Sequence, residues 1–456
     1  MTDVDGIVAL ATPPGRSGVA VIRTSGAHVL EALAPFIAIE TLSPRQAQLA
    51  QFHDPDSHSP LDQVLLLFFP QPHSFTGEDV VEIHCHGAPV VVTRILSLLV
   101  GQGLRPSHPG EFSQRAYLNG KMDLLQAEAV IALIESASLR SARQSARQLT
   151  GTLSLQLQQM RQQLLHVLVH MEASLDFSEE EIDPDGLEQM QQPLQQVADR
   201  AIRLLDSARL GQQLRQGVEW VIAGRPNVGK SSLFNRLAGR DKAIVTDIPG
   251  TTRDTNEHDL LLDGIAVRLI DTAGLRPSHD RIEQAGMERT RACVAQADGI
   301  LLMVEAQQGW LAEDQAILDQ IESRQIILVI NKCDLLATDE PALQPFMALP
   351  VAERILCSCQ TGLGMEPLLE AMARLMSQDG DEGEGTVIMA IRQQQVLQRL
   401  LQAVKECQGL LSHHSNSLEL AAPPLRQALA ALGELVGHVT NQELLQSVFS
   451  RFCIGK

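Results

Sequence analysis

Two short motifs limit what this chain can fold into. Residues 224–231 read Gly-Arg-Pro-Asn-Val-Gly-Lys-Ser, and residues 331–334 read Asn-Lys-Cys-Asp. The first fits G-x-x-x-x-G-K-[ST], a loop whose backbone N–H groups wrap nucleotide phosphates while its lysine, Lys230, reaches the β and γ oxygens. It lies between an apolar run at 218–223, typical of a buried strand, and a helical pattern at 232–237. The sequence therefore predicts a P-loop domain built on a parallel α/β sheet.

The second motif predicts that the nucleotide carries guanine. Asp334 can accept two hydrogen bonds from the Watson–Crick edge of guanine, and adenine does not offer this pair of donors. A wrong base would leave a buried carboxylate unpaired, which is costly. Ser358 and Cys359 occupy the place of the last guanine-binding loop, where a small side chain is suitable. We therefore expect this domain to bind GTP.

Two further segments predict the magnesium ligands and the phosphate sensors. Ser231 would offer its hydroxyl to Mg²⁺, and a threonine of the segment 246–254 would complete the ligands of the metal. Asp271, at the end of a predicted strand, would lie behind the metal, and the Gly274 amide would follow the γ-phosphate. The predicted GTP contacts are Asn227, Val228, Gly229, Lys230, Ser231, Ser232, Thr246, Thr251, Thr252, Asp271, Gly274, Asn331, Lys332, Asp334, Ser358 and Cys359.

These residues leave the hydrolysis step open. Phosphoryl transfer needs a positioned water and neutralisation of the charge between the β and γ phosphates. Many GTPases have a glutamine directly after the Asp-x-x-Gly segment, and Leu275 stands there in this chain. Arg253, Arg276 and Arg281 are candidate arginine fingers or ordinary surface arginines. A cation held by Asn227 would do the same electrostatic work.

Length and composition predict a multidomain protein without a membrane span. At 456 residues the chain is long enough for about three domains. It has no run of about 18 apolar residues, and its acidic start lacks the pattern of a secretory signal. Seven cysteines, an odd number, favour reduced thiols in the cytoplasm over a disulfide framework. The formal charge of −19 argues against a general polyanion binder, although it leaves room for a local basic patch.

Changes of sequence pattern divide the chain into four segments. Residues 1–120 combine Pro and Gly with short β-like runs, and residues 121–215 carry apolar residues at helical spacing. Alternating strand and helix patterns fill 216–377. A linker rich in Gly and acidic residues opens the last segment, 378–456, which is otherwise helical in pattern apart from Pro423-Pro424. The nucleotide domain therefore lies between two helix-rich segments.

Short motifs spread along the whole chain agree with one known family. They are Ala-Thr-Pro-Pro-Gly-Arg at 11–16, Phe-Thr-Gly-Glu-Asp at 75–79, Pro-Gly-Glu-Phe at 109–112, Ala-Glu-Ala at 127–129, the P-loop, Gly-Thr-Thr-Arg-Asp at 250–254 and Phe-Cys-Ile-Gly-Lys at 452–456. Over its full length the chain resembles the MnmE (TrmE) tRNA-modification GTPases. One departure is Ala88, where the family usually has a second glycine after His-Gly.

The resemblance implies an α/β and α multidomain fold. An N-terminal α+β folate-binding and dimerisation domain would span 1–120, a discontinuous helical domain 121–215 and 378–456, and an inserted Ras-like P-loop GTPase domain 216–377. It also implies a potassium-stimulated GTPase that forms a homodimer through the N-terminal domain. With an FAD-dependent partner, MnmG, this enzyme would install an aminomethyl-type group at C5 of the tRNA wobble uridine, using a tetrahydrofolate one-carbon unit.

The resemblance also assigns residues to the GTPase reaction. The K⁺ ligands would be Asn227, Thr246, Ile248 and Thr251, and the Mg²⁺ ligands Ser231 and Thr252. Glu283 would orient the attacking water through a second water. The predicted catalytic residues are thus Glu283, Lys230 and Thr252.

Four residues map to the folate contacts of the family: Arg23, Glu82, Lys121 and the terminal Lys456. A carboxylate such as Glu82 can grip the aminopyrimidine edge of a pterin, while Arg and Lys suit the acidic glutamate tail. The resemblance implies that Cys453 matters to the modification step without fixing its role. An inert, partly buried thiol is the other interpretation of this residue.

Three alternatives stay open from the sequence alone. Glu82, His84 and His86 alternate along a predicted strand, and such a set can also bind a metal. The whole protein could be a GTP-switched binding module, such as a ribosome-assembly GTPase. It could also be a folate-binding scaffold with a degenerate GTPase, although Lys230 and Asp334 are intact.

Overall fold

Two compact units divide the chain. A computed structural model describes residues 5–39, 41–56, 59–176, 184–240, 257–271, 294, 297–321, 325–336, 344–377, 387–413, 418–437, 442–450, 452 and 454–455. The first unit is made of Met1–Ile131, Gln148–Leu194 and Glu406–Lys456, and the second of Ala132–Arg147 and Gln195–Lys405. Within the described residues, each unit contains one six-stranded sheet. None of the described helices has the length and apolar character that a membrane crossing needs.

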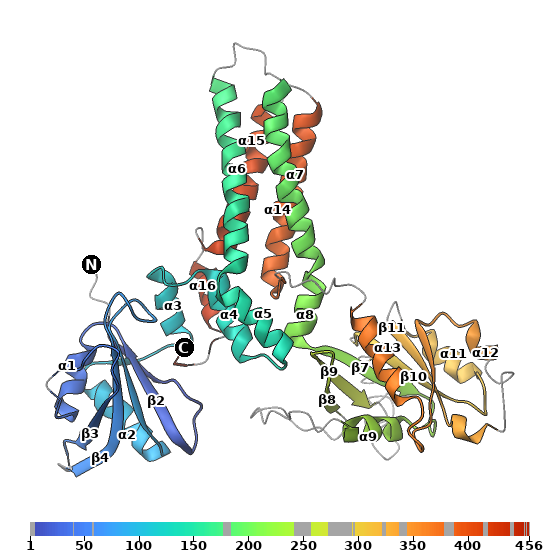
Figure 1. Cartoon of the computed structure of the whole chain (residues 1–456), viewed down its shortest axis with the longest axis horizontal. Coiled ribbons are helices and arrows are strands. Elements are labelled where there is room, and N and C mark those ends of the chain that lie inside the picture. Colours follow the sequence, from blue (N-terminus) through green and yellow to red (C-terminus); the bar gives the residue numbers. More distant parts are fainter. Residues whose placement is uncertain are drawn as a thin grey trace. The chain divides into compact units, whose positions relative to one another are not determined.

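The sheet of the first unit is formed by the N-terminal domain (Figure 1). Its strands are β1 (Ile7–Leu10), β2 (Ser17–Ser25), β3 (Gln48–Asp54), β4 (Ser59–Phe69), β5 (Val80–Gly87) and β6 (Arg105–Pro106), in the order β3-β4-β5-β2-β1-β6. Neighbouring strands are antiparallel, apart from the parallel pair β1 and β6.

One face of this sheet holds the core of the domain. Ile22, Leu66 and Ile83 pack there with residues of α1 (Val29–Leu33), η1 (Ala34–Phe36) and α2 (Pro89–Gly101). Because side chains alternate along a strand, Arg23 and Glu82 lie on the opposite face. The two faces thus separate the apolar core from the residues predicted to bind folate.

Helices dominate the segments on both sides of the P-loop domain. They are α3 (Glu111–Leu118), α4 (Leu124–Ile134), α5 (Leu139–Leu149), α6 (Thr152–Asp176), α7 (Pro184–Asp206), α8 (Ala208–Gln216), α14 (Ile391–His413), α15 (Leu418–Val436) and α16 (Gln442–Phe449). Helix α15 packs along α6, and α16 packs against α3 and α4 through Phe449 (Figure 1). Segments far apart in sequence therefore meet, which confirms the discontinuous helical domain.

The second sheet belongs to the P-loop domain. Its strands are β7 (Val218–Gly224), β8 (Glu257–Leu262), β9 (Ile265–Asp271), β10 (Gly299–Glu305), β11 (Gln325–Asn331) and β12 (Glu353–Leu356), in the order β12-β11-β10-β7-β9-β8. Its described helices include α9 (Lys230–Arg240), α11 (Ala312–Leu318), η3 (Cys333–Leu335), α12 (Gln344–Met347) and α13 (Met365–Ser377). Neighbouring strands are parallel except β8 and β9. This topology confirms the predicted Ras-like α/β fold.

Both faces of this sheet are buried. Along β7, Trp220 and Ile222 pack into one apolar core, and Val221 and Ala223 pack into the other. Strands covered on both faces carry continuous apolar runs, which is why the sequence pattern located them. Because both faces are tightly packed, a glycine within these strands can have no space for a side chain.

We predict that Gly299→Ala destabilises the P-loop domain. A Cβ at Gly299 would lie 2.6 Å from the buried indole of Trp220, so the methyl group would force one of the strands to move. We expect a loss of about 1–3 kcal/mol in unfolding free energy. Gly239→Ala in α9 is the control, because open space surrounds that position. Urea unfolding followed by tryptophan fluorescence measures both, and equal midpoints for the two variants would contradict the prediction.

Candidate functional site

The P-loop has the backbone conformation that the motif predicts. It joins β7 to α9 with positive φ angles at Gly224 (145°), Asn227 (66°) and Gly229 (106°). A Cβ at Gly229 would lie 2.3 Å from the amide nitrogen of Asn331, so glycine is required there. Lys230 donates from Nζ to the carbonyls of Gly224 at 2.8 Å and Arg225 at 2.7 Å. The loop therefore curls around one buried positive charge.

The predicted magnesium residues meet at the end of the P-loop. Ser231 Oγ donates to Asp271 Oδ2 at 2.8 Å, and Asp271 is buried at the end of β9. Hydroxyl and carboxylate oxygens are the ligands that Mg²⁺ prefers in proteins. The residues present therefore fit a Mg²⁺ site, with Ser231 as the direct ligand and Asp271 behind it.

The guanine-side residues surround the side chain of Asn331. Its Nδ2 donates to the carbonyl of Val228 at 2.8 Å, and its Oδ1 accepts from the Cys359 amide at 3.0 Å. Ser358 is buried, and Cys359 is half-buried. Lys332 pairs with Glu305 at 2.9 Å, and Glu305 stands at the end of β10. Asn331 thus connects the P-loop with the last guanine loop.

Asp334 is exposed in the structure, whereas its motif predicts a buried carboxylate. It lies in η3, a single turn at the surface, so the protein alone does not enclose its side chain. Several predicted residues lie outside the described part of the chain. These are Thr246, Ile248, Thr251, Thr252, Gly274 and Glu283. Their roles therefore stay predictions.

Arg225 is a P-loop residue whose role the sequence motif does not predict. Its Nε donates to Asp314 Oδ1 at 2.8 Å, and its Nη1 donates to Gln308 at 2.9 Å. Asp314 is fully buried, and its Oδ2 accepts from the Leu311 amide at the start of α11. The pair thus ties the P-loop to α11. The only sequence signal was an acidic residue in the first turn of that helix.

A second cluster of predicted residues lies in the N-terminal domain. Arg23 on β2 and Glu82 on β5 are direct register partners, and their side chains form an ion pair at 2.7 Å. Nε2 of His84 lies 3.4 Å from the other oxygen of Glu82. The guanidinium also lies 5.7 Å from the Phe75 ring and 5.9 Å from the Phe112 ring, within cation–π range. Arg23 therefore fixes the orientation of the Glu82 carboxylate.

The C-terminal segment reaches the same cluster. Nη1 of Arg23 donates to the carbonyl of Gly455 at 3.4 Å. Gly455 has a φ of 93°, and a Cβ there would lie 2.3 Å from the Leu10 carbonyl. Cys453 and Lys456 themselves lie outside the described residues. Lys121 is exposed beyond the end of α3.

The metal alternative finds no support in the described part of the chain. No group of three or more His, Cys, Asp or Glu side chains is arranged there to hold a metal ion. His86 pairs with Asp62, at 2.6 Å between Nδ1 and Oδ1. Glu82 already forms its ion pair with Arg23.

These observations define a class of protein. A P-loop that closes on Lys230, the Ser231–Asp271 contact and the Asn331 bridge at the carboxyl edge of a mostly parallel sheet are the features of a Ras-like P-loop GTPase domain. In this chain that domain accompanies an α+β domain and a discontinuous helical domain.

Comparison with known proteins places the chain more narrowly. Residues 6–121 match the family model of the GTP-binding protein TrmE N-terminus, and residues 124–453 match that of the MnmE helical domain. A protein of Magnetococcus marinus named tRNA modification GTPase MnmE is 46% identical over 463 residues, covering 99% of this chain and 98% of that protein. Proteins with the same name from Nitrosomonas europaea (42%, with 100% of both chains covered) and Aquifex aeolicus (39%, with 99% of both covered) are also similar. The chain belongs to the MnmE family of tRNA modification GTPases.

We predict that Asp314→Ala weakens both folding and nucleotide binding. The substitution leaves the guanidinium of Arg225 buried without its closest carboxylate, which costs about 3–5 kcal/mol. The control is Glu313→Ala, since Glu313 is exposed and lies 4.0 Å from the same guanidinium. Denaturant unfolding and GTP titration distinguish the two. Similar losses in both variants would show that the buried pair has no special role.

Proposed function

We propose that this chain is a potassium-stimulated GTPase that acts with an FAD-dependent partner of the MnmG type. The pair installs an aminomethyl-type group at C5 of the wobble uridine of tRNA, with a tetrahydrofolate derivative as one-carbon donor. The observation that carries the proposal is the presence of two separate sites in one chain. One is the P-loop site, and the other is the Arg23–Glu82 pair of the N-terminal domain.

The P-loop site supports GTP hydrolysis with Mg²⁺. Lys230 and the loop amides bind the β and γ phosphates, Ser231 and Thr252 hold Mg²⁺, and Asp271 orients Ser231. The metal, when bound, neutralises negative charge on the phosphate oxygens. Asp334 selects guanine, and Asn331 keeps the last guanine loop in register with the P-loop. Glu283 orients the attacking water.

Asn227 supports the assignment of a monovalent cation. It is exposed in the P-loop and has a left-handed backbone, so its side chain is accessible to an ion from solvent. An amide oxygen is a suitable ligand for K⁺, and a cation beside the β/γ bridge stabilises the charge of the transition state. Thr246, Ile248 and Thr251 are the proposed remaining ligands.

We predict that GTP hydrolysis is faster in KCl than in NaCl at equal ionic strength. We expect a difference of about tenfold or more, equivalent to about 1.4 kcal/mol of transition-state stabilisation. Asn227→Gly removes the amide while keeping the positive φ, so the variant should lose the ion dependence and retain GDP affinity. Steady-state phosphate release over a range of protein concentrations measures the effect. Equal rates of the natural protein in both salts would move catalysis to an arginine or to a partner.

The Arg23–Glu82 pair supports folate binding. Both side chains are mostly buried, and the ion pair holds the carboxylate in a fixed orientation in which it can accept hydrogen bonds from an aminopyrimidine edge. Because the Arg23 guanidinium is already bound to Glu82, we assign to it the role of holding the carboxylate. Lys121, which is exposed, and Lys456 would then bind the acidic tail.

We predict that Glu82→Gln weakens tetrahydrofolate binding by about 30-fold or more, equivalent to a loss of about 2 kcal/mol for a charged hydrogen-bonding group. His86→Ala is the control on the same strand, since His86 is exposed and paired with Asp62. Anaerobic titration calorimetry with the full chain measures both. Absence of folate binding in the natural protein would favour the alternative, a GTP-switched module such as a ribosome-assembly GTPase.

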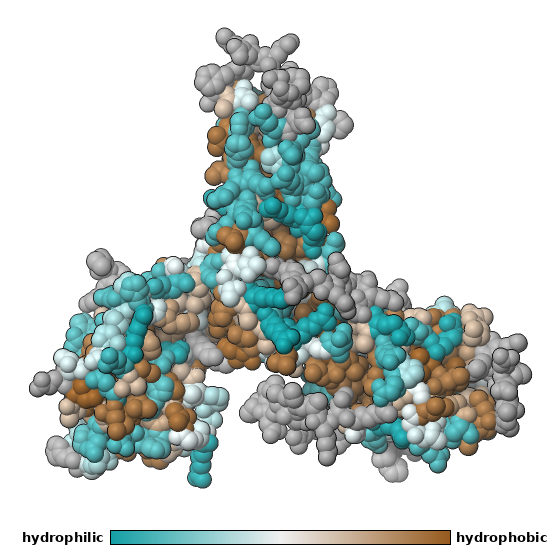
Figure 2. Space-filling model, viewed as in Figure 1, coloured by the Kyte–Doolittle hydropathy of each residue, from teal (hydrophilic) through white to brown (hydrophobic). Residues whose placement is uncertain are grey.

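The partners follow from the same proposal. The face of the N-terminal sheet opposite α2 exposes Leu49 and Leu65, which are register partners on β3 and β4. Figure 2 shows apolar patches on this domain, whereas much of the surface along the long helices is hydrophilic. We assign the sheet face to a homodimer contact. The protein would work in the cytoplasm, where tRNA is modified.

A further inference from the structure

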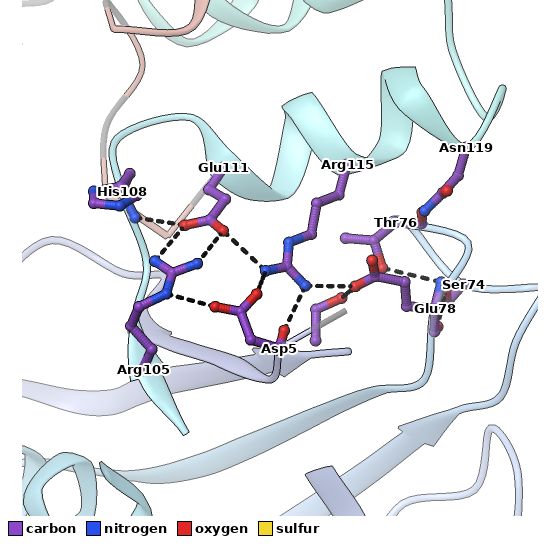
Figure 3. Close-up of polar contacts among 10 residues, drawn as sticks. Asp5, Ser74, Thr76, Glu78, Arg105, His108, Glu111, Arg115 and Asn119 are labelled. Atoms are coloured by element: carbon purple, nitrogen blue, oxygen red, sulfur yellow. Dashed lines mark hydrogen bonds and ion pairs between the residues drawn. The ribbon is translucent and has the colours of Figure 1, made fainter. Parts of the chain in front are cut away.

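A network of ion pairs is attached to the loop at 74–79, which leads into β5. Its centre is Arg115 on α3, whose side chain is only 8% exposed. The guanidinium contacts three carboxylates: Asp5 at 2.9 Å, Glu78 at 3.1 Å and Glu111 at 2.9 Å (Figure 3). Two of them, Asp5 and Glu111, also pair with Arg105, so the cluster holds three carboxylates and two arginines, one carboxylate more than charge balance needs. The arrangement therefore calls for a reason beyond neutralising Arg115.

One part of the network holds α3 against β6 and the start of the chain. Arg105 pairs with Glu111 at 2.7 Å and with Asp5 at 2.7 Å, and the His108 amide donates to Glu111 at 2.8 Å. Burial raises the pKa of Glu111, but the hydrogen bonds from Arg105, His108 and Arg115 outweigh it and hold the pKa below its ordinary value. This part is complete without Glu78.

Glu78 connects the network to the loop at 74–79. The oxygen that accepts from Arg115 also accepts from Ser25 Oγ at 2.7 Å, and Ser25 lies 2.6 Å from Thr76 Oγ1. At the other end of α3, Asn119 Nδ2 donates to the Thr76 carbonyl at 2.7 Å (Figure 3). Ser25 and Thr76 are fully buried. The loop is therefore attached to α3 at two points and to the end of β2.

The same loop also contacts two of the proposed folate residues. Phe75 lies over Arg23, with 5.7 Å between the ring centre and the guanidinium carbon. A Cβ at Gly77 would lie 3.1 Å from Asn119 Cβ and 3.4 Å from Lys121 Cγ, so there is little space between the loop and these two side chains. The loop thus touches the Arg115 network through Glu78 and approaches Arg23 and Lys121 through Phe75 and Gly77.

We propose that Arg115 and Glu78 are positioning residues of the folate site, whose ion pair holds the loop at 74–79 so that Phe75 stays over Arg23 of the Arg23–Glu82 pair. The inference rests on the proposed function of that site. Arg115 acts through the loop, because its own side chain is buried. Apparent affinity falls in proportion to the fraction of molecules whose loop is in place. A loop in place one-tenth of the time would weaken binding about tenfold.

Two matched substitutions test the proposal. Glu78→Ala and Asp5→Ala each remove one carboxylate from Arg115 and leave it two, but only Glu78 belongs to the loop. We expect Glu78→Ala to raise the dissociation constant of tetrahydrofolate about tenfold or more, and Asp5→Ala less than about twofold. Amide hydrogen exchange at 74–79 should speed up in Glu78→Ala alone. Glu78→Gln keeps the acceptor oxygen and should restore most of the affinity.

Each outcome bears on the inference. Equal weakening by Glu78→Ala and Asp5→Ala, or unchanged exchange at 74–79 in Glu78→Ala, would overturn the positioning role. If Glu78→Ala fails to fold, Asn119→Ala tests the same loop, because Asn119 is exposed and its bond to Thr76 is the second attachment. Absence of tetrahydrofolate binding in the natural protein would overturn the proposed function and this inference together. Normal binding by the natural protein and by Glu78→Ala would overturn this inference alone.

Discussion

The nucleotide site depends on one buried side-chain amide. Asn331, at the end of β11, donates to the Val228 carbonyl in the P-loop and accepts from the Cys359 amide after β12. The carboxyl ends of parallel strands meet at one edge of a sheet, but the sheet itself does not fix the positions of the loops relative to one another. The Asn331 side chain fixes the P-loop relative to the loop after β12. Leaving the Val228 carbonyl or the Cys359 amide without its hydrogen bond would cost about 1–3 kcal/mol. Gly229 leaves room for this bridge, since a side chain at that position would collide with the amide of Asn331.

In the N-terminal domain, the register of two strands fixes the positions of the site residues. Arg23 and Glu82 are paired because β2 and β5 align them, and alternation puts both on the face opposite the core. A slip of one residue in either strand would move its member of the pair to the core face, where Ile22 and Ile83 now pack. The apolar pattern that stabilises the sheet therefore also fixes the charged pair. The same strand register therefore determines both the stability of the core and the position of the site.

Local signals predicted much of this structure. The P-loop, Asp271 and the buried strands were readable because each lies within a short motif or a continuous apolar run. The Arg225–Asp314 pair was not readable, because its members lie 89 residues apart and only the packing of α11 brings them together. Pro423 and Pro424 were expected to interrupt the helical pattern, yet α15 runs through both. They lie close to its start, where Glu419 and Leu420 are exposed and water can solvate the freed carbonyls. Glu283 and the K⁺ ligands rest on family resemblance, and they stay predictions.

The charge of the chain bears on how it would meet tRNA. Its 36 Lys and Arg residues face 55 Asp and Glu residues, and in the N-terminal domain several arginines are committed to carboxylates, namely Arg23, Arg94, Arg105 and Arg115. Affinity for a nucleic acid rests largely on cations that neutralise phosphates and release counterions. An arginine held by a carboxylate contributes little to this, because its field is already cancelled at short range. In the function we propose, stable tRNA binding would therefore depend on phosphate contacts from the FAD-dependent partner, and this chain would supply the folate and GTP chemistry.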